Sequence, residues 1–378
     1  MHIGFLTLEY PPLPSGGIGS SIRNLARALV DQGHRVSVVG WGHSARFDDR
    51  GVAVRFWSRR FLPKTGWLVS RLSLQRELRR LVDHEGLDIV EAHDWSGLSA
   101  GIRPGCPIVV RCHGSAVYFA HLLSETVRPS VQCAERLALA CADAIAAVSR
   151  FAAAETARLF GVRQSIAVLY NGVDLTQFEA VSPAGVEDRT LVYVGTIVRK
   201  KGVLDLCRAF SRVVSEIPDA SLIVVGRDAP DKATASASTW ALCERELSAA
   251  AARRVTYLGP QAYERIQQFV QRAAVCVFPS HAEALPVAWL EAMACARPVV
   301  AYDIGWAPEI VQEGRTGLLA PHGDVEALGH CVLRLLRDPV LGSALGAAGR
   351  SAVEEQFSSQ VTATRTADWY RRVLGRPC

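Results

Sequence analysis

Residues 274–302 of the chain read AVCVFPSHAEALPVAWLEAMACARPVVAY, and this stretch decides the fold class. Its two ends, 274–279 and 298–302, are short runs containing β-branched and aromatic residues, as strands do. Its middle consists of good helix formers, with Pro286 near the first turn, where proline is favoured. A strand, a helix and a strand in this order predict a parallel sheet with a crossover helix.

The same alternation continues outward from this stretch over the whole chain. The predicted strands are 2–8, 34–40, 52–57, 88–92, 107–112, 144–148 and 165–170 in the first half, and 190–195, 220–226, 254–259, 274–279 and 298–302 in the second. Residues 171–190 between the two series are polar and rich in Gly, Pro and Asp, which is typical of a linker. We therefore predict an α/β protein with two doubly wound, Rossmann-like domains facing across a cleft.

The length of 378 residues also exceeds the roughly 100–200 expected for one domain. We predict a first Rossmann-like domain over residues 1–175 and a second over 176–358. The chain from Asp324 onward is expected to be helical, and residues 352–374 form its last predicted helix. Residues 359–378 of this helical end are long enough to cross back to the first domain.

The composition is that of an ordinary globular protein, with 49% apolar and 21% charged residues. The longest apolar stretches, such as 138–148, fall short of the roughly 18 residues that would cross a bilayer. Residues 1–12 lack the basic and long apolar regions of a signal peptide and predict a first strand. The ten cysteines are scattered singly, which favours reduced thiols in a cytoplasmic protein and argues against a zinc site.

The formal net charge of +5 and the isoelectric point of about 8.7 are too mild to indicate a nucleic-acid partner, and we expect none. Residues 55–80, however, contain eight Arg and Lys residues against Glu77 alone, with Trp57, Phe61 and Trp67 among them. Such a surface binds anionic bilayers, which predicts peripheral membrane contact. A solvated basic helix over the sheet explains the stretch equally well.

A glycine-rich stretch, Gly16-Gly17-Ile18-Gly19, follows the first predicted strand and opens an amphipathic helical pattern. Glycines in this position let the backbone approach an anion, which the free N–H groups and dipole of a helix N-terminus attract. The spacing is not that of a dinucleotide-binding fingerprint. A tight turn that needs positive φ is the alternative explanation.

A second loop, after the first strand of the second half, carries three consecutive cations, Arg199, Lys200 and Lys201. Open α/β sheets bind ligands at the carboxyl ends of their strands, so this position favours phosphate binding. A solvated charged loop is the alternative interpretation.

Glu283 and Glu291 stand eight residues apart, the first before the predicted helix and the second inside it. That step spans roughly 12 Å, which is too far for the carboxylate pair of a glycoside hydrolase. Both are instead placed to bind hydroxyls on either side of a pyrophosphate at the helix N-terminus around 285–288. A nucleoside-diphosphate sugar has this shape. The alternative is a dipole-favoured charge and an exposed helix Glu.

Taken together, these motifs resemble family 4 glycosyltransferases of the GT-B fold. The resemblance rests on Glu283-x7-Glu291 with the residues that follow, 296–321. Supporting motifs occur in the family's order and cover nearly the whole chain: Gly16–Gly19, His113 in RCHGS, Asn171–Asp174, VGTIVRKKG at 194–202 and IVVGRD at 223–228.

The resemblance implies a retaining, metal-independent transfer of a sugar from a nucleotide donor to an acceptor hydroxyl. Glu291 would bind the ribose, Glu283 the donor sugar, Lys201 the diphosphate, and His113 the donor sugar near the reacting carbon. His113, Glu283 and Lys201 would be catalytic. The implied donor-binding set is Gly16, Gly17, Thr196, Arg199, Lys201, Arg227, Glu283, Ala284, Leu285, Pro286, Val287 and Glu291. The nucleotide-sugar is a cosubstrate, and no metal or other cofactor is implied.

The chain departs from the family pattern at two positions. Thr196 stands where members commonly carry Arg, so either Arg199 or Arg227 supplies the second cation or the phosphate is held more weakly. Ala284 replaces the Gly often found after the first Glu. The alternative interpretation of His113 is a core histidine. For His93-Asp94 two interpretations stay open, a wall of the acceptor cleft and a helix cap.

We therefore expect a hexosyltransferase that uses a UDP-sugar, with GDP-mannose as the alternative donor, and an acceptor glycan, glycolipid or small molecule. It would serve bacterial glycan or glycolipid assembly in the cytoplasm or on the inner face of the plasma membrane. The alternatives are transfer to a secondary metabolite, a nucleotide-sugar epimerase of the same fold, and a non-catalytic sensor.

Overall fold

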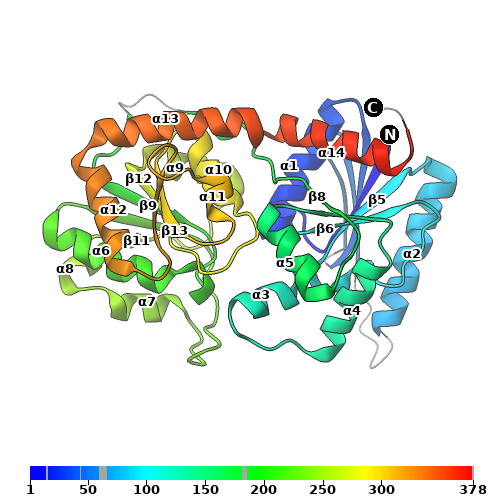
Figure 1. Cartoon of the computed structure of the whole chain (residues 1–378), viewed down its shortest axis with the longest axis horizontal. Helices are drawn as coiled ribbons and strands as arrows, with labels where there is room; N and C mark the ends of the chain where they lie inside the picture. Colours follow the sequence, from blue (N-terminus) through cyan, green and yellow to red (C-terminus); the bar gives the residue numbers. More distant parts are fainter. Residues whose placement is uncertain (14–15, 43, 59–65, 181–184, 377–378) are drawn as a thin grey trace. The chain divides into compact units, whose positions relative to one another are not determined.

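The computed structural model describes residues 1–13, 16–42, 44–58, 66–180 and 185–376, with the backbone alone for 66–68. Its contacts divide the chain into two compact units, residues 1–172 with 359–378, and residues 173–358. Each unit is a mainly parallel sheet covered by helices (Figure 1). The predicted α/β class with two doubly wound domains is confirmed.

The sheet of the first unit has eight described strands in the order β3-β4-β2-β1-β5-β6-β7-β8. They are β1 (His2–Leu6), β2 (Arg35–Gly42), β3 (Ala45–Asp49), β4 (Val52–Ser58), β5 (Ile89–His93), β6 (Ile108–Cys112), β7 (Ala144–Ala147) and β8 (Ile166–Val168). All of them pair in parallel except β3, which is antiparallel to β4. Because the order reverses between β1 and β5, the loops after these two strands flank the switch point where such sheets bind ligands.

Helices cover both faces of this sheet. One face packs against α1 (Gly17–Asp31) and α14 (Ser359–Val373), and the other against α2 (Gly66–Glu85). The alternation of β1 shows the two faces, since Phe5 lies in the first core cluster and Leu6 in the second. The remaining helices are α3 (Ala116–Leu122), α4 (Pro129–Ala140) and α5 (Arg150–Phe160), with the 3-10 turn η1 (Trp95–Gly97).

A buried ion pair fixes α14 to the sheet of the first unit. The guanidinium of Arg111 donates to both carboxylate oxygens of Glu91, at 3.0 and 2.9 Å, and the hydroxyl of Tyr370 on α14 donates to the same carboxylate at 2.7 Å. All three side chains are buried. A buried charge pair is tolerated when its remaining polar atoms are hydrogen-bonded, as they are here.

The second unit has six described strands, all parallel, in the order β11-β10-β9-β12-β13-β14. They are β9 (Thr190–Val194), β10 (Ser221–Val225), β11 (Val255–Tyr257), β12 (Val275–Phe278), β13 (Val299–Asp303) and β14 (Leu318–Pro321). The helices are η3 (Arg199–Lys201), α6 (Val203–Glu216), α7 (Trp240–Glu246), α8 (Ala249–Ala252), α9 (Tyr263–Arg272), α10 (Val287–Ala294), α11 (Ala307–Ile310), α12 (Val325–Arg337) and α13 (Pro339–Gln356). The switch point of this sheet lies between β9 and β12.

Two details differ from the prediction. The last predicted helix, 352–374, is broken at Phe357 and Ser358 into α13 and α14, and the boundary between the units falls at this break. In addition, β3 and β14 were not predicted. The central strand–helix–strand stretch, by contrast, is confirmed as β12, α10 and β13.

Candidate functional site

Two loops at the switch point of the second unit carry most of the predicted donor residues. Residues 195–202 follow β9, and residues 279–286 follow β12. The N–H of His281 donates to the carbonyl of Lys200 at 2.8 Å, which joins the loops. Gly202 has a φ of +68°, and a Cβ there would lie 1.7 Å from the carbonyl oxygen of Pro279. Only glycine permits this close approach.

The structure brings Lys201 and Glu283 into direct contact. The Lys201 ammonium forms an ion pair with Oε1 of Glu283. The Glu283 side chain is 9% exposed and that of Lys201 25% exposed, so the pair is largely shielded from water. An ammonium has three donor positions, so Lys201 keeps the capacity to bind a phosphate oxygen beside Glu283.

Glu291 is buried within α10 and is held from a neighbouring helix. Its Oε1 accepts a hydrogen bond of 2.7 Å from the hydroxyl of Tyr263, at the start of α9. The residue is only 4% exposed, because α10 is apolar on nearly all sides and is packed into the unit. Glu291 is therefore not the exposed helix residue of the alternative interpretation.

The remaining predicted residues of this stretch lie at the N-terminal end of α10. The helix begins at Val287. Pro286, which was predicted near the first turn, is the N-cap residue directly before it. Ala284, Leu285 and Val287 are buried. The backbone N–H groups of the first helical turn follow directly on the loop that carries Glu283.

Arg199 and Arg227 are the two candidates for the cation that family members commonly carry at position 196, and their contacts differ. Arg199 donates two hydrogen bonds to Asp231, at 3.0 and 2.9 Å, and these bonds lower the pKa of the Asp231 carboxyl to about 2. Arg227 is exposed and its side chain has no hydrogen bond or ion pair with any residue that the structure describes. Thr196 is half-buried. Arg227 is thus the uncommitted cation of the two.

A cluster that the sequence did not predict supports the loop after β12. Asp205 Oδ2 accepts a hydrogen bond of 3.0 Å from the hydroxyl of Tyr302 and lies 3.2 Å from Nε2 of His281. Nδ1 of His281 lies 2.9 Å from Nε2 of His322. Burial alone would raise the pKa of Asp205, but the hydrogen bonds from His281 and Tyr302 lower it below its usual value. These residues come from four separate segments, and no sequence pattern connects them.

In the first unit, the glycine-rich stretch lies at the N-terminus of α1. Glu9 Oε2 accepts hydrogen bonds from the N–H groups of Gly16 and Gly19, at 2.7 and 3.3 Å. Neither Gly16 nor Gly17 has a positive φ, so the tight-turn explanation does not apply to them. A Cβ at Gly17 would have no described neighbour within 4 Å. Packing against the described residues therefore does not explain why position 17 is a glycine.

His113 follows β6, at the same edge of the sheet as the glycine stretch, and its environment keeps it neutral. The residue is 8% exposed, and burial lowers the pKa of its imidazole well below the usual value, with nearby Arg111 and His93 adding to the effect. Its backbone N–H donates to Oδ1 of Asp94 at 2.9 Å. The sequence did not predict this contact.

His93 and Asp94, at the end of β5, are buried polar neighbours with unusual protonation. Neither ring nitrogen of His93 has a described partner, and burial lowers its pKa to about 4. Burial raises the pKa of Asp94 to about 7. The Asp94 side chain does not cap the 3-10 turn that follows it, so the helix-cap alternative is wrong. It instead holds the backbone at His113.

The basic stretch 55–80 is only partly described, because Phe61 and the rest of 59–65, and the side chain of Trp67, lie outside the described residues. Arg71 is buried, and its guanidinium donates to the carbonyls of residues 97, 98 and 100. Arg55 and Arg80 pair with Glu85 and Glu77. The described part of this stretch therefore presents fewer free cations than its sequence suggests.

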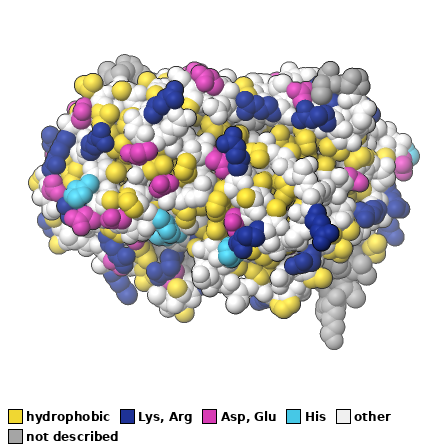
Figure 2. All heavy atoms as spheres, in the orientation of Figure 1, with side chains coloured by type: hydrophobic (Ala, Val, Ile, Leu, Met, Phe, Trp, Pro, Cys, Tyr) yellow, Lys and Arg dark blue, Asp and Glu magenta, His cyan; other side chains and the backbone are white. Residues whose placement is uncertain are grey.

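Three observations concern partners other than a nucleotide-sugar. Among the described residues, no helix is long and apolar enough to span a membrane. Within the same residues, no group of three or more His, Cys, Asp or Glu side chains is placed to hold a metal ion. On the face shown in Figure 2, Lys and Arg side chains are scattered with Asp and Glu among them.

Two Rossmann-like units, each with polar residues gathered at its switch point, define the GT-B class of fold. Residues 15–177 match the family model described as glycosyltransferase family 4, and residues 188–338 match the model described as glycosyl transferases group 1. The chain is 31% identical to α-maltose-1-phosphate synthase of Mycolicibacterium smegmatis, over 99% of this chain and 100% of that protein. The chain belongs to glycosyltransferase family 4, as its motifs predicted.

Solved structures agree on the fold. Sucrose-phosphate synthase from Thermosynechococcus elongatus superposes with a TM-score of 0.81 at 21% identity, over 99% of both chains. Anabaena HepE, solved in complex with UDP and glucose, gives a TM-score of 0.79 at 18% identity, over 98% of this chain and 100% of that one. At these identities the likeness establishes the fold alone, and the predicted GT-B fold is confirmed.

Proposed function

We propose that this glycosyltransferase transfers a hexosyl residue with retention of configuration from a UDP-sugar to an acceptor hydroxyl, with GDP-mannose as the alternative donor. The observation that carries the proposal is the pair of contacts flanking the start of α10. Lys201 is paired with Glu283 before the helix, and Glu291 is held by Tyr263 within it. Both carboxylates are thus oriented by a partner before any ligand arrives.

The donor would lie along this part of the second unit. The Glu291 carboxylate, which Tyr263 orients, would accept hydrogen bonds from ribose hydroxyls. The pyrophosphate would bind the N–H groups at the start of α10 and the Lys201 ammonium. Glu283 would accept hydrogen bonds from hydroxyls of the sugar. Arg227, which is uncommitted in the structure, would supply the second cation in place of the Arg that Thr196 replaces.

These groups would also perform the catalysis. Negative charge develops on the nucleoside diphosphate as the glycosidic bond breaks, and a preorganised ammonium and helix N-terminus stabilise it. In a front-face substitution, the departing phosphate oxygen takes the proton of the acceptor hydroxyl while that hydroxyl bonds to the anomeric carbon. His113, kept neutral by burial, would hydrogen-bond the donor sugar near that carbon without adding charge.

The relatives support the substrate class. HepE was solved with UDP and glucose, and the mycobacterial relative is named for the synthesis of a glucose-containing sugar phosphate. We propose an acceptor glycan, glycolipid or small molecule on this basis, within bacterial glycan assembly.

Peripheral contact of residues 55–80 with an anionic membrane is a separate part of the proposal. Flotation with anionic vesicles at low salt tests it, and absence of the protein from the floating fraction would refute it.

A transfer assay tests the main proposal. The full chain would be incubated with UDP-glucose or GDP-mannose and a panel of sugar and sugar-phosphate acceptors in the presence of EDTA. We expect a product whose new linkage has the anomeric configuration of the donor. The one-bond carbon–proton NMR coupling at the anomeric carbon reports this configuration. An inverted linkage would refute retention, and interconversion of the donor without any acceptor would indicate the epimerase alternative.

A further inference from the structure

A pocket of about 640 Å³ lies at the opposite edge of the second unit's sheet from the candidate donor site. Its lining includes Arg189, Ala274 and Pro298, which directly precede β9, β12 and β13. The donor residues follow the carboxyl ends of β9 and β12. Since a five-residue strand is roughly 16 Å long, the two sites are separated by the depth of the sheet.

Arg297 lines this pocket and is a buried cation without a carboxylate partner. The residue is 7% exposed. Its Nε donates to the carbonyl of Cys295 at 3.1 Å, and its two terminal nitrogens have no hydrogen bond or ion pair with any described residue. Burial lowers the pKa of Arg297 below its ordinary value. The terminal nitrogens are not among the described polar atoms that are buried without a partner, so they open onto the pocket, where an anion can bind them.

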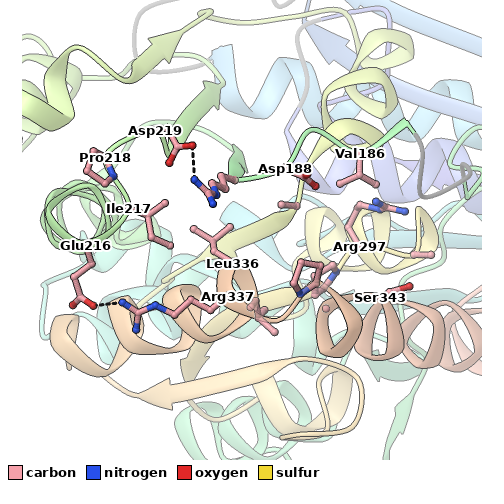
Figure 3. A pocket seen from close by; sticks show the side chains of 17 residues that line it. Val186, Asp188, Glu216, Ile217, Pro218, Asp219, Arg297, Leu336, Arg337 and Ser343 are labelled. Carbon is pink, nitrogen blue, oxygen red and sulfur yellow. Dashed lines mark hydrogen bonds and ion pairs between the residues drawn. The ribbon is translucent and has the colours of Figure 1, made fainter.

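The other charged residues of the pocket are mostly paired. In Figure 3, Asp219 and Glu216 each meet an arginine across a dashed line, whereas Arg297 stands apart from them. These partners are Arg189 for Asp219 and Arg337 for Glu216. Asp188 is exposed at the pocket and makes no hydrogen bond or ion pair with a described residue, although its charge acts on the nearby Arg189. One cation and one carboxylate therefore remain available to a ligand.

The lining determines the kind of ligand. A planar guanidinium binds phosphate through two parallel hydrogen bonds. The free carboxylate of Asp188 and the hydroxyl of Ser343 accept hydrogen bonds from hydroxyl groups. Apolar side chains such as Ile217, Pro298 and Leu336 form walls against which a ring can pack. The volume falls in the range of small-molecule sites, about 300–1,000 Å³.

We propose that this pocket binds a small sugar phosphate, with the phosphate on Arg297 and the sugar hydroxyls on Asp188 and Ser343. The site is independent of the donor site and of the transfer reaction proposed above. Its occupation therefore does not require that the proposed function be correct.

Gly342 offers a variant that fills the pocket without removing any contact. It lies in α13, it is buried, and a Cβ there would be 3.8 Å from Cγ of Pro298, an ordinary contact distance. A leucine side chain at this position would extend into the pocket. Alanine at the same position adds a methyl group alone and improves helix propensity, so it is the matched control.

Calorimetric titration of the full chain with glucose 1-phosphate and glucose 6-phosphate, in saturating UDP, tests the proposal. We expect one of them to bind with 1:1 stoichiometry. Arg297→Gln should weaken that binding by about tenfold or more, the loss expected for a charge-assisted hydrogen bond. Gly342→Leu should abolish it, whereas Gly342→Ala and the exposed control Arg253→Gln should retain it.

Each other outcome contradicts the proposal. If neither sugar phosphate binds, or if binding survives both Arg297→Gln and Gly342→Leu, the pocket is not the site. If inorganic phosphate binds as tightly as the sugar phosphates, or glucose alone does, the ligand class is wrong. If Arg297→Gln fails to fold, Gly342→Leu still tests the pocket, because it removes no native contact.

Discussion

The hydroxyl of Tyr263, at the start of α9, donates a 2.7 Å hydrogen bond to Oε1 of Glu291 in the middle of α10. The two residues are 28 positions apart in the sequence. This bond holds a buried carboxylate from a neighbouring helix. Tyr263 is therefore a positioning residue for the proposed ribose site.

Tyr263→Phe removes this bond and keeps an aromatic ring against Phe178. We expect nucleotide binding to weaken by about threefold to tenfold, since one hydrogen bond contributes about 0.5–1.5 kcal/mol. The Michaelis constant for the donor should rise while the turnover number changes little, because Tyr263 would act on the proposed ribose contact alone and not on the leaving phosphate or the sugar. Steady-state kinetics over a range of donor concentrations checks this. An unchanged Michaelis constant with a reduced turnover number would contradict the positioning role.

The Lys201–Glu283 pair allows stability and activity to be separated. Lys201→Met leaves a buried carboxylate without its cation and should reduce the free energy of unfolding by about 1–3 kcal/mol. Adding Glu283→Gln neutralises that carboxylate and should restore most of the loss, whereas transfer activity should stay absent in both variants. Denaturant unfolding and the transfer assay measure the two properties.

Lys232→Met is the control, since Lys232 is exposed and has no described partner. It should leave both the unfolding free energy and the transfer rate unchanged. Recovery of transfer in the double variant would show that the pair is structural.

Gly17→Ala should reduce activity without reducing stability. A methyl group at Gly17 meets no described atom within 4 Å, and alanine favours the helix that begins there. We expect an unchanged or slightly raised melting temperature and a clear fall in the transfer rate, because the family resemblance implies a backbone contact of Gly17 with the diphosphate. Thermal unfolding and initial rates test this.

Gly202→Ala provides the contrast to this variant. Its Cβ would collide with the carbonyl of Pro279 in a backbone of positive φ, and the protein should be destabilised by more than about 1 kcal/mol. A Gly17→Ala enzyme as fast as the wild type would exclude close approach of a ligand at Gly17.

The neighbours His93 and Asp94 predict opposite dependences of stability on pH. Between about pH 4 and 6.5 the unfolded chain binds a proton at His93 that the folded chain does not, so this residue makes stability rise with pH. Between about pH 4 and 7 the folded chain keeps a proton on Asp94 that the unfolded chain has lost, so this residue makes stability fall with pH. Over their shared range the two effects offset each other in the wild type.

Single variants should reveal each effect. Relative to the wild type, the unfolding free energy of His93→Gln should fall as pH rises, and that of Asp94→Asn should rise, each by up to about 1.4 kcal/mol per pH unit. Denaturant unfolding at several pH values in this range measures both slopes. Parallel curves for the wild type and both variants would contradict the buried protonation states.

Sequence patterning predicted the fold well because most strands are short apolar runs buried on both faces. It missed β3, whose sequence ARFDD is half exposed and pairs at the edge of the sheet, and β14, which has four residues and ends at Pro321. It also joined α13 to α14, since the residues around Phe357 keep a helical pattern through the break. Local pattern does not show where a helix passes from one packed unit to the next.

The candidate site was predicted by residue type and position but not by contact. The sequence placed Lys201 and Glu283 in the loops after two strands and Glu291 inside the helix that follows, and the structure puts each of them there. The bonds that orient or occupy these groups join residues distant in the chain, such as Arg199 with Asp231, 32 positions apart, and Asp94 with His113, 19 apart. Such pairings depend on strand order and packing, which hydrophobic periodicity does not specify.

The most direct measurement is calorimetric binding of UDP, GDP and ADP to the wild type and to Glu291→Ala, in EDTA. Glu355→Ala, which alters an exposed carboxylate on α13, is the control. We predict that UDP binds the wild type and the control equally, and that Glu291→Ala weakens binding by about tenfold to a hundredfold, the effect of losing hydrogen bonds to a charged group. Failure of all three nucleotides to bind, or equal affinity in Glu291→Ala, would contradict the assignment of the donor site to the start of α10.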